Sequence, residues 1–320
     1  MGVLTRALVV TIVVFASGSV ARALETDQYY AWERAIADSE AAINAWVNRE
    51  IESELAEIRS SRARRPPECE AVTHRIVARF RSLLFHDVVT FVSNSPEVDR
   101  YPKSYDEVQA YRRGNQYKRA MPWQVINWMP PSPTLEAAGV RFGADKFGHF
   151  FSQGGLYYRW YRSARSEGLD AASARQLAIR RGLVLERLFL GGTLEGVLSP
   201  ADLEGNYQGM RFYAGLCERP ALELAADGWR LAVPFRLREY LTPEWDESWA
   251  PNLVTDRVFR KLEPALRAYC PKLDDPATLG RRAYYAAIDR ITETERALYA
   301  LLEERAIPDP TRFRLETVCR

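Results

Sequence analysis

The chain has 320 residues, of which 47% are hydrophobic and 27% are charged, and its formal net charge is +2. This composition supplies a sizeable core, in one large or two modest domains, and excludes a disordered or repetitive chain. The near balance of charge leaves no basic surface of the kind that binds nucleic acid.

The first 23 residues have the pattern of a secretory signal. Arg6 precedes an apolar run over residues 7–16, and the segment ends in Ala21-x-Ala23. The run is too short to span a bilayer comfortably, and no cysteine stands at the cleavage point to accept lipid. We expect cleavage after Ala23, a periplasmic or secreted mature protein and no transmembrane segment in the mature chain. Removal of Arg6 and Arg22 leaves 44 − 2 = 42 basic residues against 42 acidic ones.

Two helical patterns and one capping box follow. Apolar residues recur at intervals of three, four and seven over residues 27–60, which predicts a long amphipathic helix. After RRPPE, a second helix is expected over residues 69–94, ending at NSP. Ser104 and Glu107 then form a capping box for a short helix that Gly114 closes.

Two histidines and two tryptophans in the N-terminal part of the chain are interpreted from the segments in which they lie. His74 and His86 lie twelve apart on the second helix, off one stripe, and we interpret both as structural or simply exposed. Trp123 and Trp128 lie in MPWQVINWMPPSP, where the prolines prevent regular helix. This stretch predicts an ordered loop that covers the core and brings both tryptophans near the site described next, as candidate substrate-binding groups.

Polar groups concentrate in VRFGADKFGHFFSQGG. Asp145 and His149 are four residues apart and Ser152 is seven from Asp145, so on a helix they share one face, while the phenylalanines occupy the other and pack inward. Lys146 belongs to the same set. The alternative is that Asp145 caps the helix after an extended VRFGA and that the polar face is solvated.

A second helix is expected from Ala171 to about residue 194, apolar nearly all round and therefore buried. Its core-facing stripe would consist of Leu177, Val184, Leu188 and Glu195. A carboxylate at such a position needs a partner, either His149 or Lys146, or must become neutral. Alternatively, Gly191 and Gly192 end the helix and Glu195 lies in a solvated turn.

A third helix has a readable start, with Ser199 as N-cap, Pro200 at the first helical position and Asp202 at the third. Capping alone would explain Asp202. It does not explain the face shared by Asn206, Gly209 and Tyr213, nor the small residues Gly205 and Gly209, which let another helix come close.

Over residues 140–217 the chain resembles VanZ-like proteins, the teicoplanin-resistance family, and related predicted periplasmic proteins. The shared pattern is Asp145, Lys146 and His149, then Glu195, then Asp202, Asn206 and Gly209. The family carries it on membrane-spanning helices. Here arginines interrupt the same segments, namely Arg159, Arg162, Arg165, Arg175, Arg180 and Arg181. The resemblance implies the site geometry but neither the membrane embedding nor a particular reaction.

The C-terminal third begins with an acidic and aromatic segment, TPEWDESWAPN. Asp246 and Glu247 beside two indoles match the acid and base of a glycosidase, but adjacent carboxylates on an extended segment point apart. We therefore interpret the segment as a loop across the core. Helices are predicted over residues 254–269, bent at Pro264, and 277–305. The inner face of the last helix would be Leu279, Ile288, Ile291, Leu298 and Leu302.

The chain has four cysteines, an even set for an oxidising compartment, which predicts two disulfides. Three connectivities are possible. We favour Cys69 with Cys319 and Cys217 with Cys270, which would tie the ends of the chain together. No two cysteines have the close spacing of a zinc knuckle.

The predicted fold is all-α, an irregular multi-helix bundle with little or no sheet. Its regions are an N-terminal helical region over residues 24–125, a central site region over 126–218 and a C-terminal helical region over 219–320, together one compact unit.

Two classes of function fit the polar set. In the slightly favoured one, the residues form a buried hydrogen-bonded network that fixes three helices, in a structural or partner-binding component of the cell envelope. In the other, His149 is the general acid or base of an envelope enzyme, with Glu195 and Asp145 beside it and Lys146, Asp202 and Asn206 holding a polar or anionic substrate. A metal-dependent hydrolase with Asp145, His149, Glu195 and Asp202 as ligands is a weaker third reading, because Lys146 would oppose a cation. We expect no cofactor, and the oligomeric state is open.

Overall fold

The computed structural model describes residues 26–61, 65–81, 87–119, 132–186, 197–303 and 310–320. It is 65% helical, and its strands, 9% of the chain, are short and antiparallel, so the predicted irregular α-helical fold is confirmed. The helices are α2 (Glu40–Ser60), α3 (Cys69–Phe80), α4 (Asp87–Asn94), α5 (Tyr105–Gly114), α7 (Lys146–Gly148), α8 (Gly154–Ser166), α9 (Ala171–Leu185), α10 (Pro200–Glu218), α11 (Asp256–Arg267), α12 (Pro276–Ile288), α13 (Glu293–Glu303) and α14 (Leu315–Val318).

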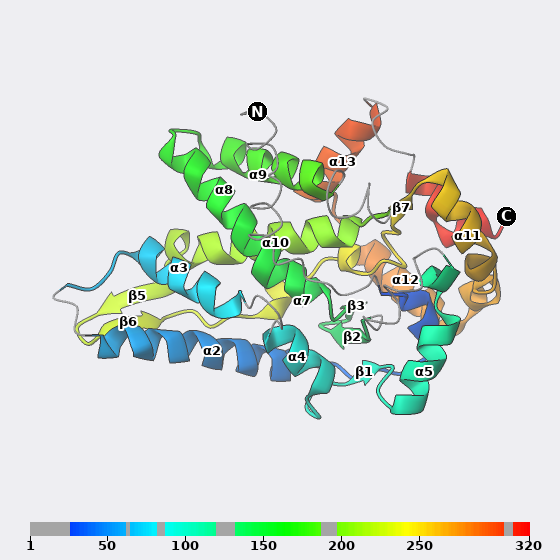
Figure 1. The fold of residues 1–320 in the computed structure, drawn as a ribbon, viewed down its shortest axis with the longest axis horizontal. Coiled ribbons are helices and arrows are strands. Elements are labelled where there is room, and N and C mark those ends of the chain that lie inside the picture. Colours follow the sequence, from blue (N-terminus) through cyan, green and yellow to red (C-terminus); the bar gives the residue numbers. More distant parts are fainter. Residues whose placement is uncertain (1–25, 62–64, 82–86, 120–131, 187–196, 304–309) are drawn as a thin grey trace, which may run out of the picture.

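Short 3-10 and π turns connect these helices. They are η1 (Gln28–Ala31), η2 (Gln116–Arg119), the π-helical η3 (His149–Gln153), η5 (Leu237–Glu239), η6 (Pro243–Trp245), η7 (Cys270–Asp274) and η8 (Pro310–Phe313). Figure 1 shows α10 running through the middle of the molecule, with α2 and α3 on one side and α8 and α9 on the other.

Within the described ranges, three small antiparallel sheets connect the helices. The first has the order β1 (Arg100–Tyr101), β2 (Thr134–Ala137), β3 (Val140–Gly143); the second pairs β4 (Val197–Leu198) with β7 (Leu253–Val254); the third is the hairpin β5 (Leu222–Ala225) and β6 (Gly228–Leu231). Strands β2 and β3 pair from Thr134 with Gly143 to Ala137 with Val140. Ala138 and Gly139 turn the chain with positive φ, as a two-residue hairpin requires. The predicted extended VRFGA is thus β3, which delivers the chain to the start of α7.

The core is organised by the close approach of α10 to η3 and α8. A Cβ on Gly209 would lie 1.8 Å from the carbonyl oxygen of Phe150, and one on Gly154 would lie 2.7 Å from the Cα of Gly209. The two backbones therefore touch, and the Tyr213 hydroxyl donates to the Phe151 carbonyl at 2.9 Å. This bears out the tight packing predicted from Gly209 and Tyr213.

The N-terminal predictions are confirmed in part. The single helix predicted over residues 69–94 is wrong: α3 ends at Phe80, where Arg81 leaves the helical conformation, and α4 is a separate helix. The capping box is present, with Glu107 N donating to Ser104 Oγ and the Glu107 carboxylate accepting from Ser104 N. The long helix begins at Glu40 rather than near Asp27, so that boundary was wrong. Asp27 is buried and accepts from Gln116 N at 2.7 Å and from the Tyr269 hydroxyl at 2.8 Å. These long-range contacts hold the segment before α2 in the short η1 turn.

Helix α9 corrects the prediction of a helix buried all round. It buries one face, through Ala174, Ala178, Ile179, Gly182 and Leu183. Val184, assigned to the core, is 54% exposed, and Leu177 is only half-buried. Three of these five residues are small, and α8 comes close at one of them: a Cβ on Gly182 would overlap the Tyr157 ring. Leu188, Gly191, Gly192 and Glu195 lie outside the described residues.

The C-terminal helices are confirmed in part. Helix α11 contains Pro264 as expected. The single helix predicted over 277–305 is two helices, α12 and α13, because the chain turns after Ile288. Of its predicted inner face, Leu298 is buried, whereas Leu279 and Ile291 are 51% and 63% exposed. The burial of Leu302 lies outside the described residues.

The disulfides join Cys69 to Cys217 and Cys270 to Cys319. Two disulfides were predicted, but the favoured pairing was wrong. The start of α3 lies against the end of α10, so the first bond joins residues 148 positions apart, whereas the second joins the C-terminal segment to η7 over 49 positions. Among the described residues, no helix combines the length and the apolarity needed to cross a membrane.

Candidate functional site

The polar site begins where β3 ends. Gly143 is required there, because a Cβ would lie 2.0 Å from Thr26 Oγ1 and 2.1 Å from Asp145 Oδ1. The Thr26 hydroxyl instead donates to Asp145 Oδ1 at 2.7 Å. Lys146 follows at the first position of α7, with its side chain fully buried.

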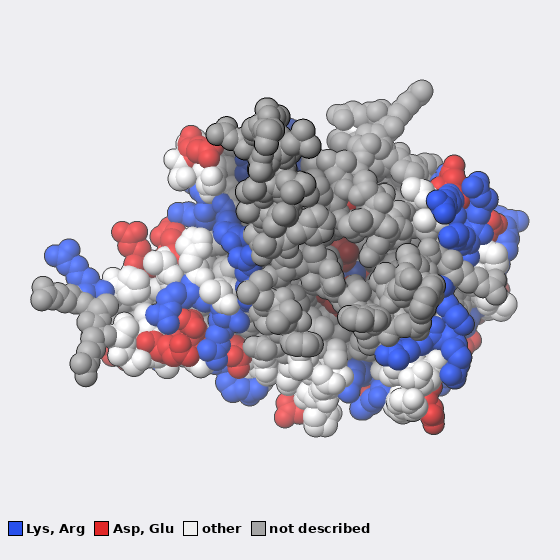
Figure 2. All heavy atoms as spheres, viewed as in Figure 1, with Lys and Arg blue, Asp and Glu red and all other residues white. Residues whose placement is uncertain are grey.

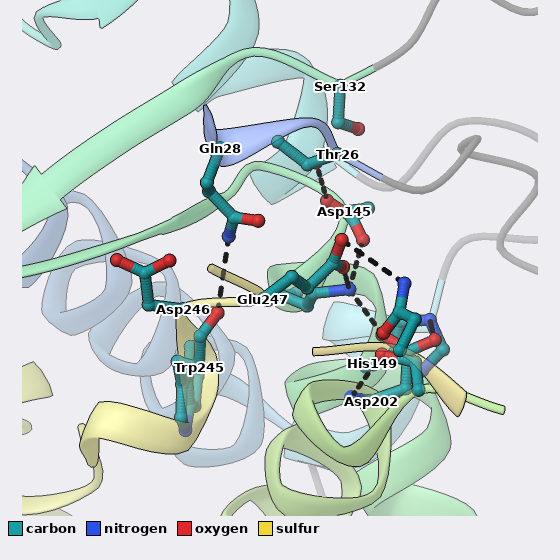
Figure 3. A network of polar contacts seen from close by, with 12 residues as sticks. Thr26, Gln28, Ser132, Asp145, His149, Asp202, Trp245, Asp246 and Glu247 are labelled. Carbon is teal, nitrogen blue, oxygen red and sulfur yellow. Dashed lines mark hydrogen bonds and ion pairs between the residues drawn. The ribbon is translucent and has the colours of Figure 1, made fainter. Parts of the chain in front are cut away.

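Lys146 is the centre of the site, and three carboxylates surround its ammonium. Its Nζ lies 2.7 Å from Asp145 Oδ2 and 2.5 Å from Asp202 Oδ1, and it also contacts Glu247 Oε1. The three acids come from the end of β3, the first turn of α10 and the segment after η6, and they converge in Figure 3. One buried cation therefore joins three parts of the chain.

His149 extends this cluster toward solvent. Its Nε2 lies 3.3 Å from Asp202 Oδ2, and its Nδ1 lies 3.1 Å from Asn206 Oδ1. With 13% of its side chain exposed, His149 is the most accessible member. It is the first residue of η3, a single π-helical turn between α7 and α8, and such turns are frequent at functional sites.

The carboxyl groups respond in opposite ways to this environment. Burial alone would raise the pKa of Asp202, but the charges of His149 and Lys146 outweigh it, and the pKa lies below its usual value. Burial raises the pKa of Glu247 to about 8, and the neighbouring Asp145 and Asp202 act in the same direction against Lys146. One ammonium does not neutralise three buried carboxylates, so Glu247 holds a proton near neutral pH.

Asp145, His149 and Asp202 offer ligand atoms that lie within 4.8 Å of one another, the only group of three or more metal-ligating residues among the described residues. A cation does not fit among them. The ammonium of Lys146 already lies between the carboxylates of Asp145 and Asp202, where it supplies the positive charge that a metal would bring. A metal ion would have to displace a fully buried lysine.

The structure brings five predicted site residues together: Asp145, Lys146, His149, Asp202 and Asn206. The solvated alternative for the polar face is wrong, because Asp145 and Ser152 are buried and the Asp145 side chain makes no capping hydrogen bond. Helix α10 is capped by Ser199, which accepts from Asp202 N, while the Asp202 carboxylate turns to Lys146 and His149. Glu195, Trp123 and Trp128 lie outside the described residues, as do His86 and the signal segment; His74 is exposed.

Glu247 was predicted to lie in a loop across the core, and its contact with Lys146 was not predicted. Figure 3 shows Asp246 and Glu247 pointing to opposite sides, as expected for neighbours on an extended segment. Asp246 accepts from Ser248 N at 2.8 Å and from the Tyr285 hydroxyl at 3.0 Å. Glu247 accepts from Asn252 at 3.3 Å and faces Lys146. The signal was the high density of acids in an otherwise apolar segment, since such acids need buried partners.

Comparison of the chain with protein-family models, with curated proteins and with solved structures found no match. The resemblance to VanZ-like proteins therefore stays a prediction, carried by the spacing of the site residues.

Proposed function

We propose that this protein is an exported component of the cell envelope with a binding or structural role, in which the Lys146 cluster fixes the packing of the fold. The Lys146 cluster comprises Asp145, Lys146, His149, Asp202, Asn206 and Glu247. The observation that carries the proposal is the complete burial of the Lys146 side chain among three carboxylates from separate segments. A buried ion pair of this kind fixes geometry and strongly penalises loss of one member.

Closure of the cluster supports a structural reading over a catalytic one. Asp145, Asp202, Asn206 and Glu247 are each no more than 5% exposed. The cavity of about 650 Å³ that α8, α9 and α10 border is lined by none of these residues. A substrate would reach only the edge of His149 without movement of the fold.

Export is the second part of the proposal. It is supported by the N-terminal signal pattern and by two disulfides, which persist in oxidising compartments. The intact mass of the exported protein, measured before and after reduction and alkylation, should correspond to a chain that begins at Leu24 and has no free thiol. A different start, or four free thiols, would contradict export by this route.

The role of the cluster is tested by replacing His149 with glutamine in a strain that lacks the gene. Glutamine keeps hydrogen-bonding capacity toward Asp202 and Asn206 but does not transfer protons at neutral pH. The variant should complement the deletion, and the degree of complementation should follow the amount of folded protein present. Normal folding with complete loss of complementation would favour chemistry at His149.

An enzyme remains the second candidate, favoured by the accessibility of His149. A histidine held between a carboxylate and an amide oxygen is oriented as general acid–base groups are. In that case Asp202 orients the ring, and the fully buried Lys146 positions Asp202.

A further inference from the structure

A second polar region lies away from the Lys146 cluster. A cavity of about 650 Å³ is bounded by α8, α9, α10, the segment from Leu241 to Pro243, and the end of α12 with the start of α13. Its volume is in the range of small-molecule binding sites. We call it the arginine groove, after the arginines that line it.

The arginine groove carries an excess of positive charge. Its arginines are Arg175, Arg211, Arg219, Arg290 and Arg296. Two glutamates also line it, so five positive charges face two negative ones, an excess of three. Both acids already have partners: the Tyr161 hydroxyl donates to Glu218 at 2.6 Å, and Arg175 lies 3.5 Å from Glu293.

The other four arginines have no carboxylate within 4.0 Å among the residues that the structure describes, so their charge faces the groove uncompensated by an ion pair. Three of them hydrogen-bond to neutral groups, and Arg290 does so through the Asp289 carbonyl oxygen, to which it donates at 2.6 Å. Arg211 donates to Gln208 Oε1 at 2.6 Å, and Gln208 donates in turn to the buried Glu204 at 2.6 Å. Arg219 lies over Gly215 and donates to the Tyr240 hydroxyl at 3.4 Å. Guanidinium groups held in this way are suited to oxyanions, which they bind through paired hydrogen bonds.

Apolar side chains occupy the same cavity. Leu241, Ile288 and Ile291 line it, and Ile291 is 63% exposed although it is a large aliphatic residue. A purely inorganic anion would leave this surface in water. A ligand that joins an anionic group to a hydrocarbon portion would cover both parts of the lining.

We propose that the arginine groove binds an organic anion, a phosphate or carboxylate group attached to an apolar portion, supplied either as a lipid headgroup or as a free molecule. This inference rests on the binding role proposed above. It is separable from the role of the Lys146 cluster, which is tested by unfolding and complementation, whereas the groove is tested by ligand titration.

Calorimetric titration of the mature protein with hexyl phosphate tests the proposal, with hexanol as the uncharged counterpart. Hexyl phosphate should bind, hexanol should not, and the affinity should fall as salt is added, because charge contributes to binding. In the double variant Arg290→Gln, Arg296→Gln the affinity should drop about 10-fold or more, as expected for the loss of charge-assisted hydrogen bonds. Both side chains are exposed, so the variant is expected to fold.

Arg230→Gln is the matched control, because Arg230 is an exposed arginine paired with Glu223 on the β5–β6 hairpin, outside the groove. It should bind hexyl phosphate as the wild type does. Flotation with vesicles that contain phosphatidylglycerol distinguishes the sources: retention lost in the double variant indicates a lipid headgroup, and binding of hexyl phosphate alone indicates a free ligand. The proposal would be overturned if neither hexyl phosphate nor the vesicles bound, or if the double variant bound hexyl phosphate with the affinity of the wild type.

Discussion

Helix α10 separates two polar regions that handle charge in opposite ways. Asp202 and Asn206 belong to the Lys146 cluster, where the lysine and the carboxyl groups are buried and lie against one another. Tyr207 and Arg211 line the arginine groove, where four guanidinium groups remain near solvent without a described carboxylate partner. On the face drawn as spheres in Figure 2, the described Lys, Arg, Asp and Glu side chains are interspersed.

Both regions are rich in charged residues, so the number of charged residues alone does not identify a binding site. Buried charges must be paired within the protein, so they contribute to folding and are costly to disturb. Charges that remain hydrated cost little in the folded state and are available to a ligand. Substitutions in the two regions should therefore separate stability from binding.

The largest effect is expected when the central lysine is removed. Lys146→Met leaves the buried carboxylates of Asp145 and Asp202 without their cation and should lower the free energy of unfolding by about 4 kcal/mol. Arg296→Met, in the groove, should change it by less than about 0.5 kcal/mol. Denaturant unfolding of the two variants at pH 7 measures both. Similar losses in the two proteins would erase the proposed distinction.

A smaller loss of stability is expected when a side chain is added at the contact between α10 and η3. Gly209→Ala places a methyl group against the Phe150 carbonyl and should cost roughly 3 kcal/mol, since the two backbones must move apart. Gly280→Ala is the control, because a Cβ at that position on α12 meets nothing within 4 Å. It should leave stability unchanged or raise it by up to about 1 kcal/mol. Equal behaviour of the two alanine variants in thermal unfolding would argue against backbone contact.

The free energy of unfolding should depend on pH because buried carboxyl groups have raised pKa values. Burial raises the pKa of Glu247 to about 8 in the folded protein, and the pKa of Glu244 likewise, because of burial and the neighbouring Glu204. A raised folded-state pKa gives stability that is fully present below the unfolded value near 4.5 and is lost as pH rises through 8. The free energy of unfolding should therefore fall between about pH 5 and 8.

Glu247→Gln should reduce that fall by roughly 2 kcal/mol, because a neutral side chain has no proton to lose. Glu263→Gln, on the exposed surface of α11, should leave the pH profile as it is in the wild type. Unfolding curves collected from pH 5 to pH 9 give the comparison. An unchanged slope in Glu247→Gln would show that Glu247 is already ionised across this range.

The sequence predicts the fold class and five members of the Lys146 cluster because both depend on local spacing. Asp145, Lys146 and His149 lie within five residues, and the start of α10 is marked by Ser199 and Pro200. Their meeting follows from the glycines that let α10 approach η3. The helices that carry these residues and their caps are local features, so helical periodicity and capping rules suffice to find them.

Other features depend on tertiary contacts that spacing does not encode. Glu247 reaches Lys146 from 101 positions away, through a loop whose course depends on the packing of Trp245. The disulfide pairing depends on which segments meet in the folded chain, and the pairing favoured from the sequence is wrong. The arginine groove draws on α8, α9, α10 and α13, and no motif marks it. The predicted pair of His149 with Glu195 stays a prediction, since Glu195 lies outside the described residues.

The central claim, that the Lys146 cluster is a mutually dependent network, is tested most directly by a double-mutant cycle of Lys146→Met and Asp202→Leu, followed by denaturant unfolding at pH 7. Each single substitution strands a buried charge and should cost on the order of 3 to 4 kcal/mol. The double variant removes both partners of the 2.5 Å contact, so its loss should be smaller than the sum by at least about 2 kcal/mol. Losses that add within about 0.5 kcal/mol would mean that the two residues do not stabilise each other, and would contradict the network.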